Sequence, residues 1–324
     1  MWKITNELNK QTLNKYHLFI SDFFSLLIEI SKNKNKINLL QTNDFIINSF
    51  QKSQKLDKKL LNINRNSNDK IIPLIKEIIL LDSKILIKEF KIFNKQNLEI
   101  SKQNYNLSPK IHPESLTKLF KDYFYDKFFG VGWIWTEIIG IPYTRETFKT
   151  NFKDENGLYV CPYCDTDTIS STRNSWLEHF LPKSKFPYVS CNIDNLIPSC
   201  TSCNVSGSGK GEKHTKPICN QYTTQIGDQL VFEYINDKIK IKKNRKKVIE
   251  NYIELLNLRN KYQEISVQTR IFSSLKINYN IVLQSKDISE FEEDIFLNFI
   301  HDNGKNNGLY FVQKNLLKYI KEIK

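Results

Sequence analysis

The sequence contains no uninterrupted apolar run long enough to cross a membrane. Its most apolar stretch, residues 18–30, includes the polar residues Ser21, Asp22, Ser25 and Glu29, whereas a membrane-spanning helix needs about 20 predominantly apolar residues. The chain also does not open with a basic segment followed by an apolar core and a small-residue cleavage site. We therefore expect a cytoplasmic protein with no membrane partner, in which residues 18–30 form a buried amphipathic helix.

Internal repeats and low-complexity segments are absent as well, and acidic residues are too few to balance the basic ones. Lys and Arg number 48 against 35 Asp and Glu, giving a formal net charge of +13. Such a charge suits a polyanionic partner, and nucleic acid is the expected one. Because lysine is abundant along the whole chain, only basic clusters near a recognisable site indicate binding.

Hydrophobic periodicity divides the rest of the chain into helices, with one β-hairpin. The predicted helices cover 16–30, 71–93, 116–129, 245–260, 261–275 and 289–300, the predicted loops cover 62–69 and 97–113, and the predicted hairpin covers 230–241. The hairpin turn is expected at Asn236-Asp237. The aromatic residues of 116–129 either pack against the core or offer a base-stacking surface, and packing is the simpler interpretation.

The cysteines do not form a disulfide framework of the kind found in small secreted domains. Cys161 and Cys164 form one C-x2-C pair, Cys200 and Cys203 form another, and 35 residues separate the pairs. Two such pairs present four thiolates, which zinc binds tetrahedrally in closed structural sites. A redox pair is the alternative, but neither pair sits between a strand and a helix of a βαβ unit. Two further cysteines, Cys191 and Cys219, have no such partner and are expected to be plain thiols.

The residues between the two pairs and directly after the second suggest phosphodiester hydrolysis. That reaction needs a base to activate water, a metal ion to neutralise the developing charge, and cations to hold the strand. His179 has the ring for a base at neutral pH, since an unperturbed histidine has a pKa of about 6.5. Glu178 and Asn204 offer oxygen ligands, which Mg²⁺ or Mn²⁺ prefers.

At these residues the chain resembles the HNH, or ββα-metal, endonucleases in their cysteine-containing form. The pattern consists of the acid–histidine pair Glu178-His179, then Asn195 and Asn204, which lie 16 and 25 residues after the histidine, together with the two cysteine pairs. The resemblance implies that His179 is the general base and that Glu178 and Asn204 bind the catalytic divalent ion. It also implies that Asn195 holds the intervening loop and so orients the base.

The resemblance covers about residues 159–213, with a weaker one over 230–270. It implies a mainly α-helical fold with a central, small α+β ββα-metal (HNH) module containing a structural four-cysteine zinc site. We expect a helical N-terminal domain over 1–150, the nuclease module over 151–220, and a β-hairpin plus helical region over 221–324. The cofactors are then structural Zn²⁺ and catalytic Mg²⁺ or Mn²⁺. Two departures are Asn204 in place of a histidine, which favours an oxygen-ligated ion, and Glu178 in place of an aspartate.

Lysines flank the motif where backbone phosphates would approach. Lys183, Lys185, Lys210 and Lys213 are phosphate-binding candidates, and a solvated lysine-rich surface explains each of them equally well. The glycine-rich segment 206–211 lacks the spacing of a phosphate-binding loop and is expected to be a flexible exit from a helix.

Three functions remain open from the sequence. The leading one is a metal-dependent endonuclease acting on DNA, and the second is the same enzyme acting on RNA or tRNA. The third is a zinc-stabilised nucleic-acid-binding module without catalysis. The string around Glu178, EHFLPKSKFP, also resembles HNH proteins of Septu-type bacterial anti-phage systems, which implies a defence role and a partner ATPase or other regulatory protein.

Overall fold

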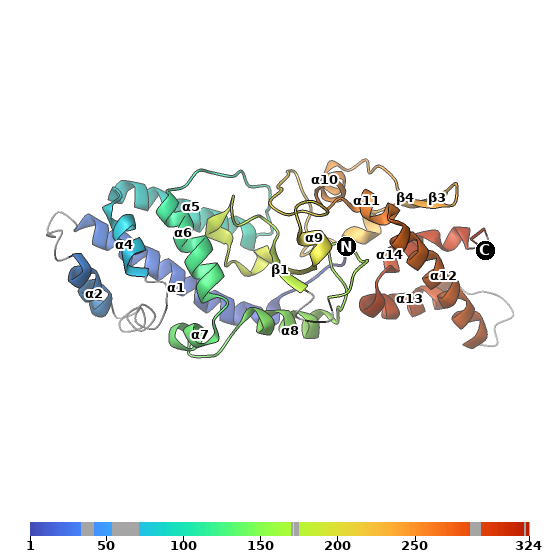
Figure 1. The fold of residues 1–324 in the computed structure, drawn as a ribbon, viewed down its shortest axis with the longest axis horizontal. Helices are drawn as coiled ribbons and strands as arrows, with labels where there is room; N and C mark the ends of the chain where they lie inside the picture. The colour runs from blue at the N-terminus through green and yellow to red at the C-terminus, as the bar shows by residue number, and fades with distance from the viewer. Residues whose placement is uncertain are drawn as a thin grey trace. The chain divides into compact units, whose positions relative to one another are not determined.

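The computed structural model describes residues 1–33, 42–53, 71–169, 171, 175–285, 293–320 and 322–323. These residues are mainly helical, with two small antiparallel two-stranded sheets (Figure 1). They form two compact units, which we describe separately: unit 1 comprises Met1–Thr5, Phe152–Glu178 and Ile197–Lys324, and unit 2 comprises Asn6–Asn151 and His179–Leu196. Among the described helices, none combines the length and the apolar character needed to span a membrane.

Unit 2 is built around one long helix. Its elements are α1 (Glu7–Lys32), α2 (Thr42–Lys52), α4 (Ile71–Leu80), α5 (Ser83–Ser101), α6 (Glu114–Lys118), the π-helix η3 (Leu119–Phe128), α7 (Gly132–Ile139), and the 3₁₀ turns η4 (Pro187–Val189) and η5 (Ile193–Asn195). Helix α1 packs against α4, α5 and α7. The aromatic side chains predicted to pack do so, since Phe120 and Phe124 are almost completely buried and meet other rings of this core edge to face.

The prediction of one helix over 71–93 is wrong in one respect. The chain breaks at Leu81 and Asp82, where the Asp82 side chain accepts a hydrogen bond from the backbone N–H of Lys84 (2.9 Å) and caps the N-terminus of α5. Helix α5 then continues to Ser101, so the expected loop at 97–113 begins later, at Lys102. The loop predicted over 62–69 lies outside the described residues.

Unit 1 holds the strands and the C-terminal helices. Its elements are β1 (Ser175–His179, whose last residue belongs to unit 2), β2 (Leu196–Cys200, whose first residue does), α9 (Thr201–Asn204), η6 (Ile226–Gln229), β3 (Phe232–Ile235), β4 (Lys238–Ile241), α10 (Lys247–Leu255), α11 (Leu258–Gln263), α12 (Ile265–Ser285), α13 (Glu293–Asn307), α14 (Tyr310–Leu316) and η7 (Leu317–Tyr319). Helix α8 (Arg145–Asn156) carries residues of both units. Strand β1, strand β2 and the short helix α9 therefore follow one another in the order strand, strand, helix.

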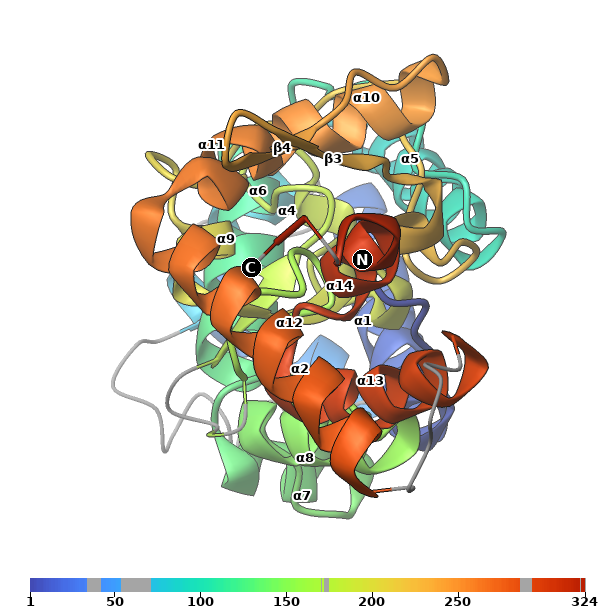
Figure 2. The same cartoon turned by 90° about the vertical axis from the view of Figure 1, so that its right-hand side faces the viewer.

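The predicted hairpin is confirmed. Strand β3 pairs antiparallel with β4 in the register Phe232 to Ile241 and Ile235 to Lys238. Asn236 and Asp237 form the turn with φ values of 50° and 57°, the left-handed backbone that a two-residue hairpin turn requires. Strand β4 packs against α11 and β3 against α14 (Figure 2).

The C-terminal helices are confirmed with shifted ends. The helix predicted over 245–260 ends at Leu255, and α11 begins at Leu258, because Asn257 takes a left-handed conformation (φ 53°) between them. The helices expected over 261–275 and 289–300 correspond to α12 and α13, although residues 289–292 lie outside the described part. The division into three consecutive domains stays a prediction, and both compact units combine segments distant in sequence.

Candidate functional site

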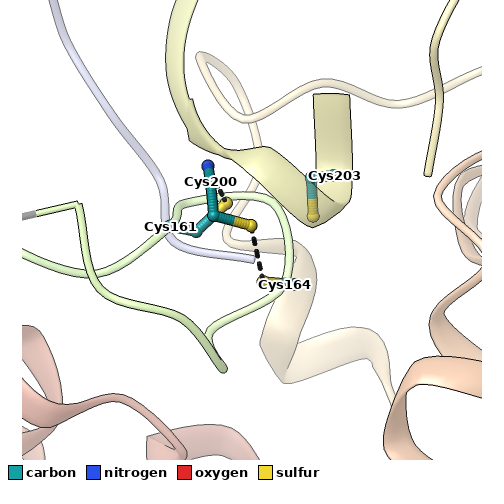
Figure 3. A group of neighbouring side chains, drawn as sticks. All are labelled: Cys161, Cys164, Cys200 and Cys203. Carbon is teal, nitrogen blue, oxygen red and sulfur yellow. Dashed lines mark hydrogen bonds between the residues drawn. The ribbon is translucent and has the colours of Figure 1, made fainter. Parts of the chain in front are cut away.

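The four cysteines of the two C-x2-C pairs meet in unit 1. Their sulfur atoms all lie within 4.8 Å of one another and all four residues are buried (Figure 3). Cys164 Sγ and Cys200 Sγ are 3.8 Å apart, far longer than a disulfide bond. A tetrahedral site with Zn–S distances of about 2.3 Å places its sulfur atoms about 3.8 Å apart. The cluster therefore has the donor set and the spacing of a structural zinc site.

Backbone N–H groups donate hydrogen bonds to two of these sulfur atoms. The first pair lies in a turn closed by the Asp165 N–H donating to the Cys161 carbonyl (2.9 Å). The N–H of Thr166 donates to Cys164 Sγ (3.5 Å), and the N–H of Cys200 donates to Cys161 Sγ (3.4 Å). Because N–H groups stabilise negative sulfur, this backbone favours thiolates, the form that binds zinc.

A buried lysine that sequence analysis did not identify lies against the cluster. Lys261 Nζ is 3.7 Å from Cys200 Sγ and 4.0 Å from Cys203 Sγ, and it forms an ion pair with Asp167 (2.7 Å). Burial alone would lower the pKa of Lys261, but the nearby thiolates of Cys164, Cys203 and Cys200 raise it above its usual range. A zinc ion with four thiolates carries a net charge of −2, which this ammonium partly compensates. No sequence signal marks Lys261, because it lies on α11, far along the chain from both cysteine pairs.

His179, at the end of β1, is held in one orientation within unit 2. Its side chain is buried, and its Nε2 lies 2.9 Å from the carbonyl oxygen of Ser190. Its ring and the Tyr125 ring form a T-shaped pair with 4.2 Å between their centroids. A carbonyl oxygen can only accept a hydrogen bond, so Nε2 carries a proton. In the neutral ring the lone pair is then on Nδ1, the nitrogen able to accept a proton.

Asn195 joins the two ends of the loop that follows β1. Its Nδ2 donates to the carbonyls of Leu181 and Val189 (3.1 Å each), and its Oδ1 accepts from the Leu181 N–H (2.7 Å). The side chain is completely buried. These three hydrogen bonds fix residues 181–189, which lead directly to the Ser190 carbonyl that holds His179. Asn195 thus ties Leu181 to Val189, and its role in catalysis stays a prediction.

Glu178 and Asn204 both lie in unit 1, on β1 and at the end of α9. Their oxygen donors fit a hard divalent ion. The Glu178 carboxylate, however, accepts a hydrogen bond from the ammonium of Lys210, which is completely buried. Lys210 also donates to the Gly211 carbonyl (3.0 Å). A divalent ion at Glu178 would therefore share this carboxylate with the ammonium of Lys210.

The glycine-rich segment after α9 returns tightly onto that helix and is not the flexible exit expected from the sequence. The N–H of Lys210 donates to the Cys203 carbonyl (2.9 Å) and that of Gly209 to the Val205 carbonyl (2.8 Å). A Cβ atom on Gly209 would lie 2.3 Å from the Cys203 carbonyl oxygen, which only glycine avoids. This return is what brings Lys210 inside to Glu178.

The other candidate lysines differ in exposure. Lys185 and Lys213 are exposed, and Lys213 Nζ donates to the Gly209 carbonyl (3.1 Å). Lys183 is partly covered and pairs with Asp126. Lys210, by contrast, is buried and not on the solvated surface that a direct phosphate contact requires.

The two remaining cysteines lie outside the four-sulfur cluster. Burial raises the pKa of Cys191 to about 12 and that of Cys219 to about 12. Both are therefore protonated thiols at neutral pH.

Comparison with known proteins finds one short region of similarity. No protein-family model matches the sequence, and no solved structure matches it. Over 60 residues the chain is 37% identical to the Septu protein PtuB of Bacillus thuringiensis. This stretch represents 18% of the chain and spans about a quarter (23%) of the length of that protein. The similarity concerns a part of each protein and does not extend to the whole of either.

Proposed function

We propose that this chain is a metal-dependent endonuclease of the HNH type that hydrolyses phosphodiester bonds in nucleic acid, with DNA as the favoured substrate. The observation that carries the proposal is the fixed orientation of the His179 ring. Its Nε2 donates a hydrogen bond to the Ser190 carbonyl (2.9 Å). The acid–histidine pair, Asn195, Asn204 and the four-cysteine cluster support it further.

In the proposed reaction, His179 is the general base. With the Nε2 proton donated to the Ser190 carbonyl, Nδ1 takes a proton from a water molecule as that water attacks the phosphorus. The bond between phosphorus and the leaving oxygen then breaks, and the leaving oxygen takes a proton from solvent. Glu178 and Asn204 would hold Mg²⁺ or Mn²⁺, which neutralises charge on the phosphate and the leaving oxygen. Asn195 keeps the loop and therefore the base in position, since displacing a base by about 1 Å is costly to catalysis.

The four cysteines have a separate role in this proposal. A structural zinc ion in the Cys161, Cys164, Cys200 and Cys203 cluster anchors the end of β2 and the start of α9. It supplies no open coordination position and takes no part in the chemistry.

The biological setting that we propose is anti-phage defence. It rests on the local similarity to the Septu protein PtuB and on the resemblance of the string around Glu178. In this setting the chain acts together with a partner ATPase or another regulatory protein, and RNA or tRNA is the alternative substrate.

The test is to replace His179 by Ala and incubate wild type and variant with plasmid, single-stranded DNA and total tRNA, with and without Mg²⁺ or Mn²⁺. We expect metal-dependent cleavage by the wild type and a loss of at least about 100-fold in the variant, the usual contribution of a general base. His301→Ala is the matched control, since that half-exposed histidine lies outside the motif. Unchanged cleavage by His179→Ala would disprove the mechanism.

A second function is favoured by the Glu178–Lys210 pair. Because a buried ammonium already neutralises the Glu178 carboxylate, the module could hold nucleic acid without cutting it, as a zinc-stabilised binding module. Tight binding by the wild type without cleavage of any of the three substrates in any metal would establish this function in place of the nuclease.

A further inference from the structure

The π-helix η3 carries an aromatic ring, that of Tyr125, which contacts both His179 and two cations of unit 2. The Tyr125 ring contacts the His179 ring at 4.2 Å. The guanidinium carbon of Arg145 lies 4.6 Å from the centre of the same Tyr125 ring, and Lys183 Nζ lies 5.0 Å from it. Arg145 and Lys183 lie 38 residues apart in the sequence, and both reach the ring that contacts the candidate base.

A single carboxylate is shared by the two cations. Asp126, the residue after Tyr125, forms an ion pair with Lys183 and lies 3.7 Å from Arg145 Nη2. The side chains of Arg145, Lys183 and Asp126 are 31%, 22% and 41% exposed, so all three are reachable from solvent. Two positive charges against one negative charge leave this cluster with a net charge of +1.

We propose that Arg145 and Lys183 bind a backbone phosphate of the nucleic acid beside His179, and that the phosphate takes the place of the Asp126 carboxylate. This proposal rests on the proposed function and names the part of the site that holds the substrate. A phosphodiester carries one negative charge, as the Asp126 carboxylate does, so the exchange conserves the charge of the cluster.

The chemistry of the two cations fits a phosphate. A guanidinium binds phosphate through several N–H groups at once, and an ammonium binds it as a point charge. Arg145 is already oriented, because its Nη2 donates to the carbonyl of Tyr125 (2.8 Å) and its head lies over the Tyr125 ring. Its Nε is buried and has no hydrogen-bond partner among the described residues. A preoriented arginine loses less freedom when it binds.

The experiment measures binding and not cleavage. Wild type and variants are titrated in EDTA against fluorescein-labelled single-stranded DNA, duplex DNA and RNA, by anisotropy at several salt concentrations. Arg145→Met and Lys183→Met should each weaken binding by about tenfold or more at low salt, the loss of one charge-assisted hydrogen bond. Each should also lower the slope of log affinity against log salt by about one.

Asp126→Asn is the decisive variant, because it separates competition from a structural role. If the carboxylate occupies the phosphate position, its removal tightens binding several-fold at low salt. If Asp126 only orders the two cations, its removal weakens binding. The proposal is overturned if Asp126→Asn binds nucleic acid more weakly than the wild type or equally well. It is also overturned if Arg145→Met and Lys183→Met both bind as tightly as the wild type.

Two controls keep the outcome clear. Lys118→Met breaks another exposed lysine–carboxylate pair of unit 2, with Glu114 at 2.8 Å, and should leave binding unchanged. Arg145→Lys keeps the charge and should retain the slope of log affinity against log salt. If Arg145→Met fails to fold, Lys183→Met and Asp126→Asn still test the proposal. Cleavage is assayed separately with Mg²⁺. If the protein cleaves nucleic acid but its binding is unchanged by Arg145→Met and Lys183→Met, this inference is wrong and the proposed function still stands.

Discussion

Lys210 is the buried charge with the clearest consequences at the scale of single residues. Its side chain is 0% exposed, and its partner Glu178 is 11% exposed. Removing one member of a buried ion pair leaves the other charged and unpaired, which typically costs about 3–5 kcal/mol, whereas removing both costs much less. Lys210 therefore stabilises the fold mainly because it matches Glu178.

We predict that Lys210→Met and Glu178→Gln each lower the free energy of unfolding by about 3 kcal/mol or more, and that the double variant is more stable than their summed effects imply. Urea denaturation of the four proteins measures this. Lys242→Met, which breaks the exposed Lys242–Glu233 pair (2.8 Å), should change stability by less than about 1 kcal/mol.

The same variants report on the proposed metal site. If Glu178 binds a divalent ion, the ammonium of Lys210 competes with it, so Mn²⁺ should raise the melting temperature of Lys210→Met more than that of the wild type. An equal Mn²⁺ effect on Lys210→Met and Glu178→Gln would show that this carboxylate is not a metal ligand.

At the scale of elements, the junction between α4 and α5 shows how one side chain sets a helix boundary. The apolar pattern continues across residues 71–93, yet the Asp82 side chain bonds to the Lys84 N–H (2.9 Å) and starts a new helix. The side-chain cap satisfies a backbone N–H at the start of α5. It therefore favours the start of a new helix over the continuation of α4.

We predict that Asp82→Ala lowers the free energy of unfolding by about 0.5–2 kcal/mol, the usual value of an N-cap. Asp82→Ser should retain most of the stability, because its hydroxyl also accepts from the N2 or N3 backbone N–H. Both are measured by urea denaturation. Equal stability of Asp82→Ala and wild type would mean that packing alone sets this boundary.

At the scale of the whole molecule, the four-cysteine cluster is expected to decide whether unit 1 folds. It joins the Cys161–Cys164 turn to the end of β2 and to α9. Structural zinc sites bind with apparent free energies of about 10–16 kcal/mol at neutral pH, as large as the stability of a typical domain. Loss of a zinc ion from this cluster would therefore remove an amount of free energy as large as the stability of a typical domain.

We predict one zinc ion per chain by elemental analysis. Cys203→Ser should lose the ion and the cooperative thermal transition, and a strong zinc chelator should have the same effect on the wild type. Cys219→Ser is the control and should retain both, since Cys219 lies outside the cluster. Retention of a full zinc equivalent by Cys203→Ser would argue against a four-sulfur site.

The sequence by itself determined the features that depend on neighbouring residues. Asn236-Asp237 predicts the hairpin because their side chains tolerate the left-handed backbone of a tight turn. The C-x2-C spacing predicts the cluster because two cysteines separated by two residues can both reach one metal ion. The order of Glu178, His179, Asn195 and Asn204 likewise suggested the chemistry, which remains a proposal.

Only the tertiary structure decided which distant side chains meet. Lys261 reaches the cysteines, Lys210 reaches Glu178, and Arg145 and Lys183 reach the Tyr125 ring across long sequence separations. No local pattern encodes these contacts, since burial and charge pairing depend on how elements pack. The lysines that looked equivalent in sequence therefore became different in the fold: Lys210 is a buried partner of Glu178, while Lys185 stays exposed.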